Sequence, residues 1–343
     1  MLVVRAITAD DLEALLDMAT QVGSGMTTLK PDRKMLGDRV TVAVQSFAET
    51  IAPEKRDYMF VMEDTSNGRM AGICAIKGAV GLDEPFYNYR IGTLVHSSRE
   101  LNVFTRMETL YLSNDLTGST ELCSLFLHPD YRIGNNGKWL SKSRFLFIAQ
   151  FPHLFTEKLI AEMRGYQEED GRSPFYEGLG RHFFKMDFNH VDNLTAIGKK
   201  SFIAELMPRQ PLYVDYLPDD AREVIGKVHT STAPARRLLE QEGMHYEGYV
   251  DIFDAGPVLQ ARVSELRAMR DSTVSTAEEA VPHAGEPTLV SNTTLHDFRM
   301  IVASAAPVQG KVALSASELA LLHCQGGDPV RTLSLNVRKN VHV

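Results

Sequence analysis

The feature that most constrains the fold is a run of short, closely spaced strand-like segments in the first half of the chain, followed directly by a helical pattern. These segments are rich in β-branched and aromatic residues, are separated by Gly, Asp and Asn, and cover residues 58–64, 69–79, 89–98, 107–112 and 121–127. A helix is predicted from about Gly137 to Gln150, a strand in "KLIAEMRG" and a second helix in "SPFYEGLGRHF". The sequence therefore predicts an α/β (α+β) fold with a mixed, mostly antiparallel sheet and flanking helices.

The chain also begins with a strand and a helix. "LVVRAI" predicts the first strand, and "TADDLEALLDMA" predicts a helix whose N-cap is Thr8. Asp10 and Asp11 fall in the first turn of this helix, where a negative charge is favourable.

The length of 343 residues is large for one domain. We expect a core in residues 1–200 and a second α/β portion that carries His229 and packs on that core, in residues 201–270. Residues 271–287, "DSTVSTAEEAVPHAGEP", are polar with two Pro, and they predict a linker or long loop. Residues 288–343 predict a small β-rich C-terminal piece.

Charge and cysteine content exclude several classes of protein. The formal net charge of -8 argues against a nucleic-acid-binding protein, because such domains usually carry a basic excess. The three cysteines, Cys74, Cys123 and Cys324, are widely separated, so neither a disulfide framework nor a metal site is predicted. No apolar run of about 18 residues predicts a membrane span, and the N-terminus does not read as a signal peptide. We expect a cytoplasmic protein.

One stretch, "CSLFLHPDYRIGNNGKWLSKSR" from Cys123 to Arg144, predicts a binding site for an anion. A strand that leads through a Gly-containing turn into a helix presents unpaired N–H groups, which suit a phosphate or pyrophosphate. Lys138 and Lys142 share one face of this helix, and we expect that face to meet the anion while an apolar face packs on the sheet. On the residues alone, a plain turn followed by a solvated helix face remains the alternative.

The same stretch resembles the acyl-CoA-binding segment of the acyl-CoA N-acyltransferase superfamily. The usual turn of that superfamily reads Arg/Gln-x-x-Gly-x-Gly/Ala, and this chain has Arg132 and Gly137 at the matching interval. Its other glycine is Gly134, whereas the superfamily more often has the glycine one position later, at Asn135 here. The resemblance implies an acyl-CoA N-acyltransferase-like fold, with Arg132, Gly134 and Gly137 at the pyrophosphate.

Longer blocks resemble one family, arginine N-succinyltransferase. They extend over nearly the whole chain and include "LYLSNDLTGSTELCSLFLHPD", "FIAELMPRQPLY", "VIGKVHTSTAPARRLLEQEG" and "YVDIFDAGP". The resemblance implies transfer of succinyl from succinyl-CoA to the α-amine of L-arginine, the first step of arginine catabolism by the succinyl route. It also implies that Leu125 binds succinyl-CoA and that His229 is the proton donor. Read without the family, Leu125 is a core residue of a strand and His229 is a structural or surface histidine.

The implied chemistry is direct attack of the amine on the thioester. A thiolate whose parent pKa is about 8.5 can take a proton from an imidazolium of pKa about 6.5. Cys123 lies in no recognisable nucleophile motif, so we expect it to pack in the core rather than to form an acyl-enzyme.

The sequence leaves several candidates for the residues that bind or deprotonate the acceptor amine. Glu162, Asp251 and Asp254 are candidates either for the base that deprotonates the amine or for partners of the substrate guanidinium. Arg90 and Arg106 are candidates for the succinyl carboxylate.

The resemblance implies succinyl-CoA as co-substrate and no prosthetic group or metal. The expected partners are succinyl-CoA and L-arginine, without nucleic acid or membrane, and a homo-oligomer is possible. Two alternatives are a non-catalytic acyl-CoA-binding sensor or subunit, and an acyltransferase with ornithine or another amino acid as acceptor. An intact His229 motif favours an enzyme, since a sensor has no thiolate to protonate.

Overall fold

The computed structural model describes residues 1–22, 26–196, 201–281 and 285–337. The strands among these residues form one continuous sheet, in the order β14-β11-β15-β12-β13-β1-β2-β3-β6-β7-β10-β9-β4-β5-β8. The strands are β1 (Leu2–Ala6), β2 (Asp57–Asp64), β3 (Arg69–Lys77), β4 (Asn88–Ser98), β5 (Val103–Ser113), β6 (Thr120–Leu127), β7 (Lys158–Glu162), β8 (Leu212–Tyr213), β9 (His245–Asp251), β10 (Pro257–Arg262), β11 (Thr273–Glu279), β12 (Thr288–Ser291), β13 (Arg299–Ala303), β14 (Lys311–Leu314) and β15 (Pro329–Ser334).

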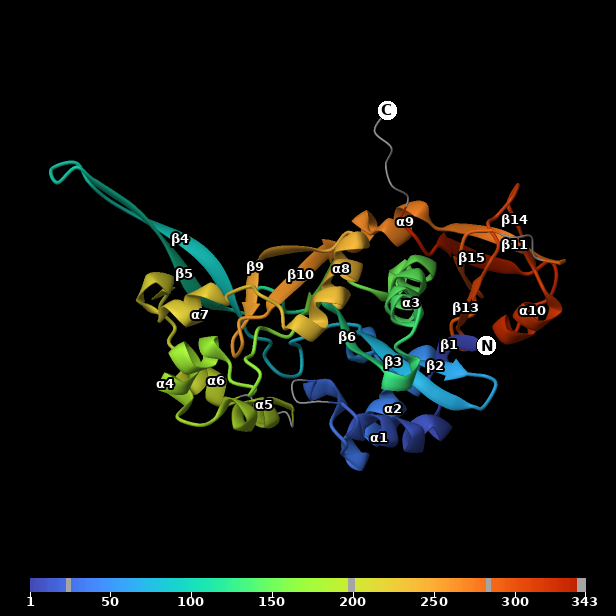
Figure 1. Ribbon diagram of the computed structural model, residues 1–343, viewed down its shortest axis with the longest axis horizontal. Coiled ribbons are helices and arrows are strands. Elements are labelled where there is room, and N and C mark those ends of the chain that lie inside the picture. The colour runs from blue at the N-terminus through green and yellow to red at the C-terminus, as the bar shows by residue number, and fades with distance from the viewer. Residues whose placement is uncertain (23–25, 197–200, 282–284, 338–343) are drawn as a thin grey trace.

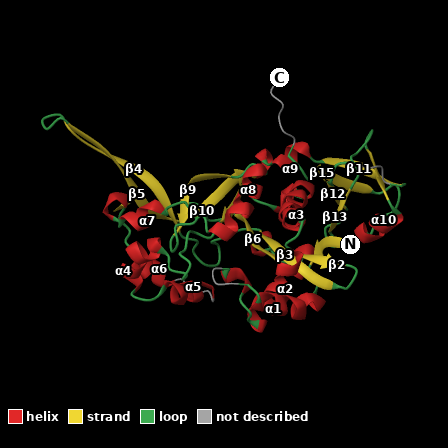
Figure 2. Cartoon of the chain, in the orientation of Figure 1, coloured by secondary structure: helices red, strands yellow, loops and turns green. Residues whose placement is uncertain are grey.

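Helices lie on both sides of this sheet (Figure 2). They are α1 (Leu12–Thr20), α2 (Arg33–Phe47), α3 (Asn136–Gln150), α4 (Arg181–Phe184), α5 (Phe188–Ala196), α6 (Ser201–Leu206), α7 (Asp219–Glu223), α8 (Ala233–Gln241), α9 (Arg267–Asp271) and α10 (Ala316–Leu322). Neighbouring strands of the described residues are antiparallel except for β6 with β7 and β11 with β14. The predicted mixed, mostly antiparallel sheet with flanking helices is confirmed. No helix of the described part of the chain is both long and apolar enough to cross a membrane.

The centre of the sheet is buried on both faces, and β2 shows how. Alternate side chains of a strand point to opposite faces. Tyr58, Phe60 and Met62 pack in the core beneath α3, whereas Met59 and Val61 pack beneath α1 and α2. All five side chains are fully buried, which explains why this segment is apolar throughout rather than alternating.

The prediction that a basic face of α3 meets an anion is wrong. Lys142 is fully buried and forms an ion pair with Glu242, and Arg144 is also buried. Glu242 follows α8, which packs on α3. A buried charge needs an opposite charge beside it, and this partner lies 100 residues further along the chain.

The segment predicted to be a linker, residues 271–287, contains strand β11, which corrects that prediction. β11 pairs with β15 on one side and with β14 on the other. Its side chains alternate, with Ser275 and Ala277 buried and their neighbours exposed. Residues 282–284 of the predicted linker lie outside the described residues, as do residues 338–343 of the C-terminal piece and the boundary expected at residue 200.

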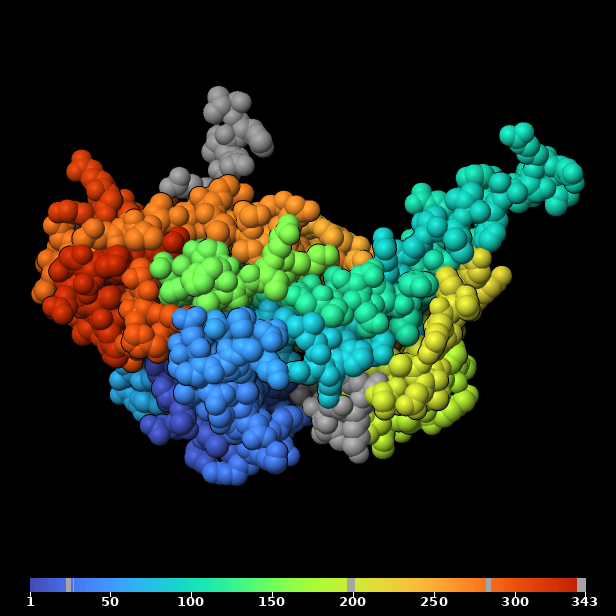
Figure 3. All heavy atoms as spheres, turned by 180° about the vertical axis from the view of Figure 1, so that it is seen from behind, coloured from blue at the N-terminus to red at the C-terminus, as the bar shows by residue number. Residues whose placement is uncertain are grey.

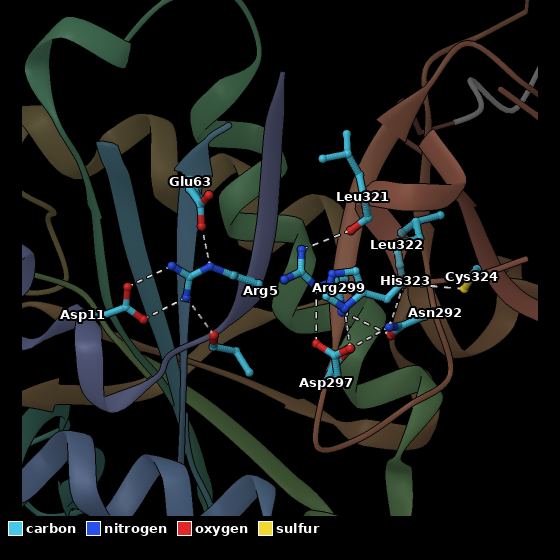
Figure 4. A network of polar contacts seen from close by, with 11 residues as sticks. Arg5, Asp11, Glu63, Asn292, Asp297, Arg299, Leu321, Leu322, His323 and Cys324 are labelled. Carbon is cyan, nitrogen blue, oxygen red and sulfur yellow. Dashed lines mark hydrogen bonds and ion pairs between the residues drawn. The ribbon is translucent and has the colours of Figure 1, made fainter. Parts of the chain in front are cut away.

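The C-terminal strands join the main sheet where β13 pairs with β1 (Figure 4). At this junction Arg5 of β1 binds the carboxylate of Asp11 through both terminal nitrogens, at 2.8 Å each, and Glu63 through Nε at 2.6 Å. Asp297 on the other side binds His323 at 2.7 Å. Residues 245–262 likewise continue the sheet, through β9 and β10.

Candidate active site

A cavity opens where two neighbouring parallel strands separate. β6 and β7 are in register only at Thr120 with Leu159 and at Glu121 with Ile160. Beyond these pairs β6 remains bonded to β3, while β7 remains bonded to β10. The space between them belongs to a cavity of about 680 Å³, whose walls include residues 121–126 and 161–164.

The wall formed by β6 contains a β-bulge. Ile73 of β3 pairs with Phe126 and Ala75 pairs with Cys123, so Ser124 and Leu125 together oppose one residue. Ser124 has a φ of +54°, which is unusual for a residue other than glycine. A bulge leaves an extra residue outside the ladder. Ser124 and Leu125, the two residues of the bulge, both line the cavity.

Side chains behind the bulge hold Ser124 in this conformation. The Arg39 guanidinium donates to Ser124 Oγ at 2.8 Å, and the Ser124 hydroxyl donates to Thr28 Oγ1 at 2.9 Å. Arg39 is itself held by Asp57 at 2.7 Å. Sequence reasoning missed these residues; the one available signal was Ser124 as the only polar residue of an apolar run.

The turn from Arg132 to Gly137 lies at the N-terminus of α3. Arg132 lines the cavity, donates from Nε to the Leu127 carbonyl at 3.0 Å, and lies 5.5 Å from the ring centre of Phe126. Gly134 has a φ of +55°, which explains a glycine at this position rather than at Asn135. Gly137 needs no such freedom.

Several backbone N–H groups of this turn are unpaired. Among the described residues, no protein acceptor is bonded to the N–H groups of Gly134, Asn135, Gly137 and Lys138. Such groups at a helix start attract an anion.

His229 lies beside the continuation of β7. Its N–H donates to the Arg164 carbonyl at 2.8 Å, and Val228 forms a β-bridge with Gly165. Its ring Nδ1 lies 2.7 Å from the hydroxyl oxygen of Ser231 and accepts the N–H of Ser231 at 3.2 Å. His229 is not among the cavity-lining residues, but Ser231 and Thr232 are. Burial, and then the nearby charge of Arg164, lower the pKa of His229.

The end of the cavity beside Arg164 and Gly165 is acidic. Five carboxylates line the cavity: Glu121 on β6, and Glu162, Asp192, Asp251 and Asp254. Burial raises the pKa of Asp192, Asp251 and Asp254, and for Asp254 the neighbouring Asp251 raises the pKa further.

Asp254 also organises the backbone around this end. Its carboxylate accepts the N–H groups of Gly165 at 2.7 Å and Gly256 at 2.9 Å. A Cβ on Gly256 would lie 1.9 Å from the Met163 carbonyl oxygen, so only glycine allows the two chain segments to approach this closely. The sequence-predicted Glu162, Asp251 and Asp254 are thus brought together.

The cationic residues of the cavity differ from those predicted. Arg90 forms an ion pair with Asp115 at 3.6 Å, Arg106 is exposed on β5, and neither lines the cavity. Arg164, which sequence reasoning missed, does line it, and its Nε is buried with no hydrogen-bond partner among the residues that the structure describes. Cys123 is buried, and burial raises the pKa of its thiol to about 11. In the described part of the chain, no group of three or more His, Cys, Asp or Glu side chains is placed to hold a metal ion.

Comparison with known proteins identifies the family. The family described as "Arginine N-succinyltransferase beta subunit" matches residues 2–268, and the family of its C-terminal domain matches residues 270–334. The chain belongs to the arginine N-succinyltransferase family. It is therefore an acyltransferase, and the resemblance seen in the sequence is confirmed.

Individual members of the arginine N-succinyltransferase family agree in length and fold. The chain is 48% identical to an arginine N-succinyltransferase of Enterobacter sp. (strain 638) and 47% identical to one of Shigella sonnei (strain Ss046), in each case over 98% of both chains. A solved structure, the arginine/ornithine succinyltransferase subunit AI from Pseudomonas aeruginosa, is 35% identical with a TM-score of 0.89, over 98% of this chain and 99% of that one. The acyltransferase-like architecture therefore extends over the full length of the chain.

Proposed function

We propose that this chain transfers the succinyl group of succinyl-CoA to the α-amine of L-arginine, giving N2-succinyl-L-arginine and CoA. This is the first step of arginine catabolism by the succinyltransferase pathway. The observation that carries the proposal is one cavity with a bulged strand on one wall and a cluster of carboxylates at its other end. Relatives named arginine N-succinyltransferase, aligned over 98% of the chain, support it.

In this proposal the co-substrate lies along β6. Backbone groups at the bulge near Leu125 bond to the pantetheine amides and polarise the thioester carbonyl, as strand addition does elsewhere. The pyrophosphate binds the unpaired N–H groups from Gly134 to Lys138, with the Arg132 guanidinium beside them. No prosthetic group is needed for the transfer.

The thiol of CoA leaves with a proton from His229. The backbone N–H of Ser231 orients the ring and leaves Nε2 as the nitrogen that faces no protein partner among the described residues. A lowered pKa makes the protonated ring a stronger acid toward a thiolate of parent pKa about 8.5. The buried, protonated thiol of Cys123 is unsuited to an acyl-enzyme, which supports direct attack by the amine.

The guanidinium of arginine and the carboxylate of the succinyl group each need a protein group of the opposite charge. We assign the guanidinium to the carboxylates at the acidic end of the cavity, with Asp254 and Asp251 held ready by backbone N–H groups. We assign the succinyl carboxylate to Arg164, since its unpaired buried Nε can donate to it. Ornithine is a second acceptor worth testing, because the solved relative is titled an arginine/ornithine succinyltransferase.

A thiol-release assay tests the proposal. Purified protein is mixed with succinyl-CoA and a thiol-reactive dye, with and without L-arginine, and the product is identified by mass spectrometry. We expect thiol release that depends on L-arginine and a product heavier by one succinyl group. Binding of succinyl-CoA without any acceptor-dependent release would favour the sensor instead. Ornithine in place of arginine measures the acceptor range.

Two further properties follow from the same proposal. We place the enzyme in the cytoplasm, where free cysteines such as Cys74, Cys123 and Cys324 persist. We also propose that it acts as a homo-oligomer.

A further inference from the structure

Arg144 of α3 is a buried cation without a counter-charge. Four basic side chains are buried in the described part of the chain: Arg56, Lys142, Arg144 and Arg267. Arg56 pairs with Glu49, whereas Lys142 and Arg267 share Glu242. Arg144, with 2% of its surface exposed, forms no ion pair with any described carboxylate. A buried charge without a partner destabilises the folded state, unless a ligand supplies the opposite charge.

The contacts of Arg144 are long and go to neutral oxygen atoms. Its Nε donates to the Ser141 carbonyl at 3.3 Å, its Nη1 to the Cys123 carbonyl at 3.4 Å and its Nη2 to Ser141 Oγ at 3.2 Å. The ionisable groups beside it are the thiols of Cys74 and Cys123. Burial raises the pKa of both thiols, so both stay protonated at neutral pH. A guanidinium has five N–H donors, and these three bonds leave two of them for a ligand.

Arg132 and Arg144 bind the same strand at two depths of the cavity. Both line the cavity, and each donates to a carbonyl group of β6. The acceptor of Arg132 is Leu127, at the end of the strand, and that of Arg144 is Cys123, directly before the bulge. Four residues of strand separate these two carbonyls, or about 13 Å. The pantetheine arm between the pyrophosphate and the thioester of an acyl-CoA spans about 15 Å when extended. With the pyrophosphate beside Arg132, the thioester lies at the depth of Arg144.

Negative charge appears at this depth only during the reaction. The succinyl carboxylate lies roughly 4 Å beyond the thioester carbonyl, and the proposed function places it at Arg164. Attack by the amine forms the C–N bond and moves an electron pair of the carbonyl group onto its oxygen. Collapse then restores the C=O bond and breaks the C–S bond. The sulfur takes a proton from His229, and the nitrogen gives one up.

We propose that Arg144 stabilises the negative charge that amine attack places on the thioester carbonyl oxygen. The inference rests on the proposed function and adds a residue to it. A fixed charge in a buried wall acts strongly on a charge that develops beside it. Because the intact thioester is neutral, Arg144 contributes to turnover rather than to binding of succinyl-CoA. A carboxylate beside Arg144 would stabilise the fold but would cancel this effect.

Arg144→Met tests the inference, because it removes the charge and leaves an apolar side chain in the interior. We expect kcat to fall by roughly 10²- to 10³-fold with both succinyl-CoA and acetyl-CoA. The Kd for succinyl-CoA, measured by calorimetry, should change less than about threefold. The melting temperature should equal or exceed that of the wild type, because an unpaired buried charge is lost. Arg144→Lys keeps the charge and should retain more activity than Arg144→Met.

The control variant is Arg106→Met. Arg106 is exposed on β5, in the arm that β4 and β5 form and that projects from the body of the molecule (Figures 1 and 3). It does not line the cavity. We expect wild-type turnover and wild-type binding of succinyl-CoA from this protein.

Infrared spectroscopy tests Arg144 without turnover. The stretching frequency of an isotope-labelled thioester carbonyl in bound succinyl-CoA falls when a nearby cation polarises the bond. It should therefore be lower in the wild type than in Arg144→Met. A wild-type protein that binds succinyl-CoA but releases no thiol with arginine would contradict the proposed function, whereas the infrared comparison would still test Arg144.

Four results would overturn the inference. Two are equal carbonyl frequencies in the wild type and Arg144→Met, and an unchanged kcat in Arg144→Met. A loss confined to succinyl-CoA would assign Arg144 to the carboxylate instead. A loss accompanied by a lower melting temperature would show that Arg144 supports the fold rather than the reaction.

Discussion

At the scale of single residues, His229 is the first to test. Replacement by Ala removes the proton donor, so we expect turnover to fall by roughly 10²- to 10⁴-fold while the KM for succinyl-CoA changes little. Single-turnover thiol release is the measurement, and His153→Ala is the control, because His153 is exposed on a short turn and is not among the cavity-lining residues. Unchanged turnover in a folded His229→Ala protein would remove the assignment.

Arg164 should determine the choice of acyl group. Loss of a charge-assisted hydrogen bond costs about 1.5–3 kcal/mol. Arg164→Gln should therefore lower kcat/KM for succinyl-CoA by roughly 10- to 100-fold, with little effect on acetyl-CoA, which has no carboxylate to bind. Arg90→Gln, outside the cavity, serves as the control. An equal loss with both thioesters would indicate a structural role for Arg164.

The buried carboxylate of Asp254 predicts how guanidinium binding depends on pH. Its raised pKa means that this carboxyl keeps its proton to a higher pH than an ordinary Asp does, whereas a guanidinium prefers the charged form. As pH rises through this raised pKa, affinity should increase and binding should release a proton. Calorimetry with ethylguanidinium, which does not titrate in this range, measures both. Asp254→Asn should flatten the profile; a wild-type profile that is already flat would contradict the assignment.

Sequence alone located part of this site. Leu125 and Arg132 lie on the cavity wall. The family resemblance assigned Leu125 to succinyl-CoA, whereas the local pattern alone indicated a core residue of a strand. Arg164 and the support from Arg39 to Ser124 could not be predicted, because they depend on a bulge and on a strand that arrives about 40 residues later. The local pattern of residues contains neither.

At the scale of elements, three buried charges form a cluster where α8 and α9 pack on α3: Lys142, Glu242 and Arg267. Glu242 accepts from Arg267 Nε at 3.0 Å and Nη2 at 2.9 Å, as well as from Lys142. The spacing of Lys142 along α3 suggested a solvated basic face. Only the packing of α8 and α9 against α3 shows that the lysine is enclosed.

Charge counting in this cluster predicts two very different variants. Glu242→Gln leaves two buried cations without a counter-charge and should lower the free energy of unfolding by about 3–5 kcal/mol. Lys142→Met leaves Glu242 balanced by Arg267 and preserves the shape of the side chain, so a change under about 1.5 kcal/mol is expected. Urea denaturation of both proteins measures the difference. Equal losses would show that packing, rather than charge balance, governs this cluster.

At the scale of the whole molecule, the C-terminal strands pack one set of side chains in the main core and another set in a core of their own with α10. Phe298 is fully buried, with ring centres 4.9 Å from Phe147 of α3 and 5.6 Å from Phe60 of β2. The polar composition of residues 271–287 suggested a linker because one face of β11 is solvated, and the strands that pair with it, β14 and β15, are distant in sequence.

A chain that ends at residue 270 tests this continuity. This shorter chain lacks β13, which exposes the edge of β1 and opens the aromatic core around Phe147. We therefore expect a protein that aggregates or melts at a clearly lower temperature than the full chain. Phe298→Ala makes the same test without truncation, and should cost about 3–5 kcal/mol of unfolding free energy. Because α3 also carries the turn from Arg132 to Gly137, both changes should weaken binding of succinyl-CoA, measured by calorimetry, although none of the described residues after 270 lines the cavity. A truncated protein that melts and binds like the full chain would show that the core is complete without these strands.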